Sequence, residues 1–151
     1  QLKDGAFSEL RKATGLASHG IGIGAFVYLR RIFERLIYEH RDQLQAEKGP
    51  IDGFDSMRME EKISALRSVL PAALVKHRSA YSILSKGLHE LTEEECKLYF
   101  PVVRSSIIQM LEEDWIQRDR KRLEKSLEQE LQRISTEING PPSKPKAGQE
   151  N

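Results

Sequence analysis

Apolar residues recur every three or four positions along most of the chain, which is the spacing of one face of an α-helix. The clearest case is the helix predicted over about residues 23–47. When successive residues are stepped by ~100°, its apolar positions fall in one broad sector. The sector contains Phe26, Leu29, Ile32, Phe33, Leu36, Ile37 and Leu44, and His40 lies among them. Because charged residues fill the opposite side, we expect this helix to bury one face in a core.

Glycine-rich segments separate the first three predicted helices. A short first helix ends near Leu16, where residues 15–24 contain four glycines. The turn cluster at residues 49–53 precedes a third helix, which extends to Leu70. The glycines of residues 15–24 recur before a helix, as glycines do in dinucleotide-binding loops. Those loops follow a β-strand, and no strand pattern precedes residues 15–24. We therefore favour close packing between helices as the reason for these glycines.

Signals for the end of one helix and the start of the next meet in the segment "YSILSKGLHELTEEEC" at residues 81–96. A fourth helix is expected to begin at Pro71 and to end at Gly87, a natural C-terminal stop. Thr92 and Glu95 have the spacing of a capping box, which opens a fifth helix. We expect that helix to kink at Pro101, because proline removes one backbone hydrogen bond.

The predicted fold class follows from these elements. No convincing strand pattern and no internal repeat occurs in the sequence, so we predict an all-α fold. It is a helical bundle of about five helices with a long, kinked C-terminal helix. A chain of 151 residues is long enough for one domain with its own core, which we place over residues 1–138. Residues 139–151 form a Pro-, Gly- and Lys-containing tail that we predict to be disordered.

Composition restricts the classes of partner. Lys and Arg number 24 and Asp and Glu number 23, so any basic site must be local. The single cysteine excludes an internal disulfide and suits a reducing cytoplasm. The longest apolar run, residues 21–29, is too short to span a bilayer, so no membrane partner is expected. The chain begins at Gln1 rather than Met, which is consistent with an excerpt from a longer protein whose other domains are candidate partners.

A narrow apolar stripe crosses the highly charged C-terminal helix. Its members follow one another at intervals of four, four, three and four residues, which is a helical spacing but covers too few heptads to identify a coiled coil. They are Leu123, Leu127, Leu131, Ile134 and Ile138. So small a bundle offers this stripe no obvious internal partner, and we expect it to mediate a homodimer. Ordinary helix packing is the alternative.

Two kinds of catalytic or metal site receive little support from the sequence. Ser85 and His89 are four residues apart, but the nucleophile elbow of a serine hydrolase needs a β-sheet. The histidines and Cys96 lack the spacing of zinc ligands, so no metal and no cofactor is expected.

The basic segment at residues 76–86 is the strongest chemical candidate, since the other basic segment, 118–125, alternates with acidic residues. Lys76, Arg78 and Lys86 are the candidate nucleic-acid-binding residues, with Tyr81 placed for stacking. His89 and Arg78 are the candidate catalytic pair. An imidazole with a pKa near neutrality can activate a ribose hydroxyl while a guanidinium stabilises phosphate charge.

Two segments together resemble the HEPN-like helical domains of bacteria. "GIGAFVYLRRIFERLI" resembles the long helix of these domains with its Gly-rich entry. "YSILSKGLHELTEEEC" is similar to their later helix end, where a histidine precedes another capped helix. The resemblance covers about residues 20–112. It implies a helical bundle that dimerises, which in many members is a metal-independent ribonuclease of defence systems and in others serves binding or assembly.

Active members of that family carry an arginine four to six residues before the histidine. His89 stands at the histidine position here, and the nearest upstream arginine is Arg78, eleven residues before it. The resemblance therefore implies RNA handling or assembly within a larger bacterial defence-type or regulatory protein, and leaves open whether the module is an enzyme. A non-catalytic helical dimerisation or scaffold module is the alternative.

Overall fold

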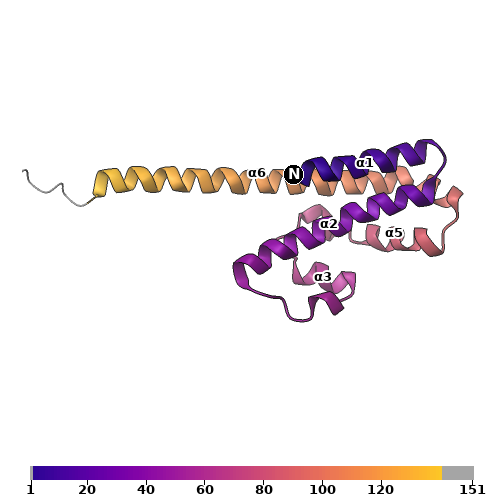
Figure 1. Ribbon diagram of the computed structural model, residues 1–151, viewed down its shortest axis with the longest axis horizontal. Coiled ribbons are helices and arrows are strands. Elements are labelled where there is room, and N and C mark those ends of the chain that lie inside the picture. Colours follow the sequence, from indigo (N-terminus) through magenta and orange to yellow (C-terminus); the bar gives the residue numbers. More distant parts are fainter. Residues whose placement is uncertain (1, 141–151) are drawn as a thin grey trace, which may run out of the picture. The chain divides into compact units, whose positions relative to one another are not determined.

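The computed structural model describes residues 2–140, with side chains from residue 5 onward. This part of the chain contains helices and no strand, so the all-α prediction is confirmed (Figure 1). The elements are α1 (Leu2–Ser18), α2 (Gly22–Lys48), the short 3-10 helix η1 (Phe54–Ser56), α3 (Met59–Ala65), α4 (Ala72–Lys76), α5 (Ser79–His89) and α6 (Glu93–Asn139). The predicted disordered tail lies outside the described residues from residue 141 onward.

Contacts along the chain define two units, residues 1–116 and residues 117–151, and each is described by itself. The prediction of one domain over residues 1–138 stays a prediction. In the second unit, the described side chains of residues 120–139 are all exposed. Within the described residues, none of the helices combines the length and the apolar composition that crossing a membrane requires.

The core of the first unit is organised around α2. Its expected apolar face is buried from Phe26 to His40, and Leu44 packs at the edge of the core. Helices α1 and α5 pack against α2 (Figure 1). The first half of α6 adds Phe100, Val103, Ile107 and Met110 to the same core. The helical periodicity of the sequence therefore identified the packed face of its longest amphipathic segment correctly.

Two glycines allow helices to approach closely. We expected Gly87 to end a helix, and this prediction is wrong. Gly87 lies inside α5, where a Cβ atom would collide with the ring of Phe26. It is not among the glycines with positive φ, so no left-handed stop forms there. At Gly22 a Cβ atom would lie 2.7 Å from the backbone nitrogen of Lys97 in α6. Close packing between helices therefore explains Gly22, whereas Gly15 would meet nothing within 4 Å and Gly20 has a φ of 80°.

Side chains cap the starts of three helices. The capping box at the start of α6 is confirmed, since Glu95 N donates to Thr92 Oγ1 at 3.1 Å and Thr92 N donates to Glu95 Oε1 at 3.2 Å. Two further caps are supplied by α6 to distant helices. Ile23 N in α2 donates to Glu93 Oε2 at 2.8 Å, and Ala73 N in α4 donates to Glu113 Oε2 at 2.6 Å.

The middle of the chain contains more and shorter helices than the sequence predicted. The third helix expected up to Leu70 consists of η1, α3 and a turn. The fourth divides into α4 and α5, because Ala80 N and Tyr81 N donate to carbonyls three residues back, at 2.9 and 3.1 Å, and so tighten the chain between them. Pro101 lies inside α6, which is continuous across it. The kink expected at Pro101 stays a prediction.

Candidate functional site

An open pocket of about 640 Å³ lies in the first unit, on the segment that connects α3 to α5. Its walls come from the turn after α3, from α4 and from the first residue of α5. The lining residues are Arg67, Leu70, Ala72, Val75, Lys76, Arg78 and Ser79. Three of the seven are cationic and three are apolar, so the wall of the pocket is partly basic and partly apolar.

Among the described residues, the three cations of this pocket have no acidic partner. Arg67, Lys76 and Arg78 are exposed, and no carboxylate of the described residues lies within 4.0 Å of their charged nitrogens. By contrast, Arg30, Arg35 and Arg41 of α2 each contact a glutamate or aspartate. The pocket is therefore a local concentration of uncompensated positive charge on a chain that is nearly neutral.

The structure separates the two candidate catalytic residues. Arg78 immediately precedes α5, and His89 is the last residue of that helix. Eleven residues at ~1.5 Å of rise place their backbones ~16 Å apart, so one chain does not bring this pair together. His89 is exposed, and its ring makes no hydrogen bond within the described part of the chain.

The candidate nucleic-acid-binding residues divide in the same way. Lys76 and Arg78 line the pocket, whereas Lys86 is exposed one turn before His89 at the other end of α5. Tyr81, expected to stack on a base, is engaged within the protein. Its ring centroid lies 5.2 Å from that of Phe33, and its hydroxyl donates to Glu34 Oε1 at 3.1 Å. Sequence reasoning missed Arg67, whose only signal was its position nine residues before Lys76.

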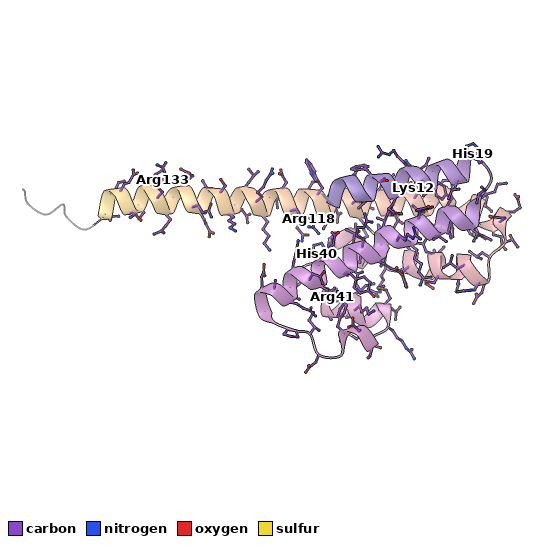
Figure 2. All side chains as sticks on the ribbon, in the orientation of Figure 1. Lys12, His19, His40, Arg41, Arg118 and Arg133 are labelled. Carbon is purple, nitrogen blue, oxygen red and sulfur yellow. The ribbon has the colours of Figure 1, made fainter. Side chains whose placement is uncertain are left out.

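A buried pair between α2 and α6 was also missed. His40 Nε2 lies 2.5 Å from Asp114 Oδ1, and both side chains are almost completely buried. Figure 2 labels His40 on α2. The pair joins two helices of the core. Because both side chains are almost completely buried, a substrate has no access to them. The one available signal was a histidine within the apolar sector of an amphipathic helix.

Cys96 is similarly unavailable for chemistry. Its side chain is buried at the start of α6, and Sγ lies 3.7 Å from the carbonyl oxygen of Gly87. Burial raises the pKa of this thiol, and the carboxylates of Glu93 and Glu95 act in the same direction. A raised pKa lowers the fraction of thiolate, which is the reactive form.

The predicted dimerisation stripe is exposed along its whole length. In the second unit, Leu123, Leu127, Leu131, Ile134 and Ile138 expose between 44% and 74% of their surface. Figure 2 shows that side chains project from several sides of this part of α6, around Arg133. Five aliphatic side chains on one helical face, all in contact with solvent, form a candidate interface.

Among the described residues, no group of three or more His, Cys, Asp or Glu side chains could hold a metal ion. No protein-family model, no curated protein and no solved structure matches this chain. The functional argument therefore rests on the pocket and on the exposed stripe.

Proposed function

We propose that this protein is a helical assembly module that forms a homodimer through the apolar stripe of α6. The exposure of all five stripe residues carries this proposal, because a contiguous row of exposed aliphatic residues along one helix face indicates an interaction surface. Pairing two copies would remove each stripe from water and leave the charged faces of both helices in solvent. Burying one such side chain stabilises an assembly by ~1.5–3 kcal/mol before the entropic cost of association.

The order of the stripe residues favours an antiparallel pair. The midpoint between Leu123 and Ile138 falls between residues 130 and 131. The midpoint between Leu127 and Ile134 falls at the same place. Two helices that run in opposite directions therefore place Leu123 of one copy opposite Ile138 of the other, and Leu127 opposite Ile134. Both copies then use the same residues, as a two-fold symmetric interface requires.

Charge along the helix favours the same direction. Residues 118–125 carry five basic and two acidic side chains, whereas residues 126–139 carry one basic and three acidic side chains. A parallel pair would set basic beside basic and acidic beside acidic. An antiparallel pair sets the basic half of one copy beside the acidic half of the other, which lowers the repulsion between them.

Light scattering tests the assembly. We expect a dimer mass for the unaltered chain and a monomer mass for Leu127→Asp combined with Leu131→Asp, because two carboxylates would be desolvated in an apolar seam. The control is Gln129→Asp combined with Gln132→Asp, which adds two carboxylates to the same helix outside the stripe. A monomer mass for the unaltered chain at high micromolar concentration would refute the proposal.

Cysteine cross-linking tests the direction. Cys96 is buried, so cysteines introduced into the stripe dominate the reaction. Under oxidation, Leu123→Cys mixed with Ile138→Cys should give a heterodimeric disulfide, while each variant alone should not. Self-linked dimers of each variant, with no mixed product, would show a parallel pair.

RNA handling by an HEPN-like module is a second proposal, and the uncompensated cations Lys76 and Arg78 favour it. Ribonuclease activity has less support, because Arg78 and His89 stand at opposite ends of α5. Metal-independent cleavage would fall by ~100-fold or more in His89→Ala, the scale for losing a general base. Incubating labelled RNA with the unaltered protein in EDTA tests this, and intact RNA contradicts catalysis. The bacterial defence context rests on the resemblance alone.

A further inference from the structure

We infer that the pocket lined by Arg67, Lys76 and Arg78 binds a compact phosphate-bearing molecule of nucleotide size. The pocket belongs entirely to the first unit, and the stripe belongs to the second, so this inference is independent of dimerisation. It also assigns a role to Arg67, which lies outside the basic segment of residues 76–86.

Charge is the first argument. Three cations line one cavity and have no acidic partner among the described residues, so a bound anion would lower their mutual repulsion. Two of them are arginines, whose planar guanidinium groups donate two parallel hydrogen bonds to a phosphate. The hydroxyl of Ser79 adds a further donor at the edge of the pocket. Several phosphate oxygens would therefore find donors within one site.

The volume of the pocket indicates the size of the ligand, and its apolar lining indicates that the ligand carries an apolar group beside the phosphates. Its volume of about 640 Å³ lies within the range of ~300–1,000 Å³ that is usual for small-molecule sites. Leu70, Ala72 and Val75 form an apolar wall beside the cations. That wall suits a planar base or another apolar group attached to the phosphates, which inorganic phosphate lacks.

The distribution of cations distinguishes a compact ligand from a nucleic-acid strand. Proteins that follow a single strand use basic groups spread along a groove, together with exposed aromatic rings. Here the cations surround one cavity, Lys86 lies at the far end of α5, and the ring of Tyr81 packs against Phe33. A molecule with its charge concentrated in two or three phosphates matches this arrangement better.

The pocket wall is fixed to the core by one of the caps described above. Glu113 of α6 accepts a hydrogen bond from Ala73 N at 2.6 Å, which fixes the start of α4. Glu113 itself does not line the pocket, and its carboxylate bonds to the backbone of α4.

Titration calorimetry with ATP, ADP, AMP and inorganic triphosphate tests the inference on the full chain. We expect saturable binding that weakens from ATP to AMP as phosphate charge is removed, and weaker binding of triphosphate, which has no group for the apolar wall. Arg67→Gln combined with Arg78→Gln should weaken ATP binding by ~100-fold, about tenfold for each charge-assisted hydrogen-bonding group lost. Arg11→Gln combined with Arg58→Gln is the matched control, because it removes the same two charges from exposed arginines that do not line the pocket.

Three results would overturn the inference. One is the absence of saturable nucleotide binding up to millimolar concentration. Another is equal ATP affinity in the double variant and in Arg11→Gln combined with Arg58→Gln, provided that all variants melt at similar temperatures. The last is tighter binding of a labelled single-stranded RNA than of ATP, which would assign the cations to a nucleic-acid strand. In the double variant Leu127→Asp with Leu131→Asp, unchanged ATP binding is expected, so failure of the dimer and failure of the pocket are separable.

Discussion

Replacing Gly87 with alanine tests the closest helix contact of the core. A Cβ atom at this position would overlap the Phe26 ring, with Cε2 at 3.0 Å and Cγ at 3.2 Å, and that ring is fully buried. Gly15 is the matched control. It also lies inside a helix, α1, but a Cβ atom added there meets nothing within 4 Å.

The difference between the two variants isolates the collision. Both gain the helix propensity of alanine over glycine, ~1 kcal/mol in a helix interior. Only Gly87→Ala also incurs the cost of overpacking, ~1–3 kcal/mol for an extra methyl group in a well-packed core. We therefore expect the free energy of unfolding to rise by up to ~1 kcal/mol in Gly15→Ala, and to be lower in Gly87→Ala than in Gly15→Ala by ~1–3 kcal/mol.

Urea denaturation followed by circular dichroism measures both values, with comparison restricted to variants of equal m-value. A second replacement, Phe26→Leu, makes room for the methyl group and should recover part of the loss when combined with Gly87→Ala. Equal stabilisation by Gly15→Ala and Gly87→Ala would refute the close approach of α5 to α2.

Two further predictions concern buried polar groups. The pKa of Cys96 is raised in the folded chain, so the folded state keeps this proton to higher pH than the unfolded state does. The resulting contribution to the free energy of unfolding is fully present below the ordinary thiol pKa of ~8.5 and should decline as pH rises above that value. Cys96→Ala should remove this part of the pH dependence, and an identical decline in both proteins would contradict it. His40→Ala should lower the free energy of unfolding by ~3 kcal/mol, because it removes one side of a buried pair and the contact that this side makes with the Asp114 carboxylate. His89→Ala, at an exposed position, should change it by less than ~0.5 kcal/mol, and equal losses in the two histidine variants would disprove the burial argument.

Local sequence signals predicted local structure well. The apolar period of residues 23–47 located α2 and its buried face, and the spacing of Thr92 and Glu95 located the start of α6. Gly87 was misread because a glycine near the end of a helical pattern can serve either as a stop or as a close contact. Only the position of the Phe26 ring decides between these roles, and that ring lies on another helix.

Contacts between distant residues were beyond the reach of the sequence. His40 and Asp114 are 74 positions apart, and nothing in either local pattern pairs them. Arg67 joins Lys76 and Arg78 only because the chain turns between α3 and α4. Conversely, Arg78 and His89 were a plausible pair in one sequence segment, but the regular rise of α5 separates them.

The glutamate caps that α6 supplies to α2 and α4 have a consequence for the order of folding. The capped amide nitrogens of Ile23 and Ala73 are 70 and 40 residues from the carboxylates of Glu93 and Glu113. Each cap therefore closes a long loop of chain, and such contacts slow the search for the native topology. The first turns of α2 and α4 should consequently become ordered late, after the core-facing part of α6 has docked, whereas the first turn of α6, capped by its own Thr92, can form at once.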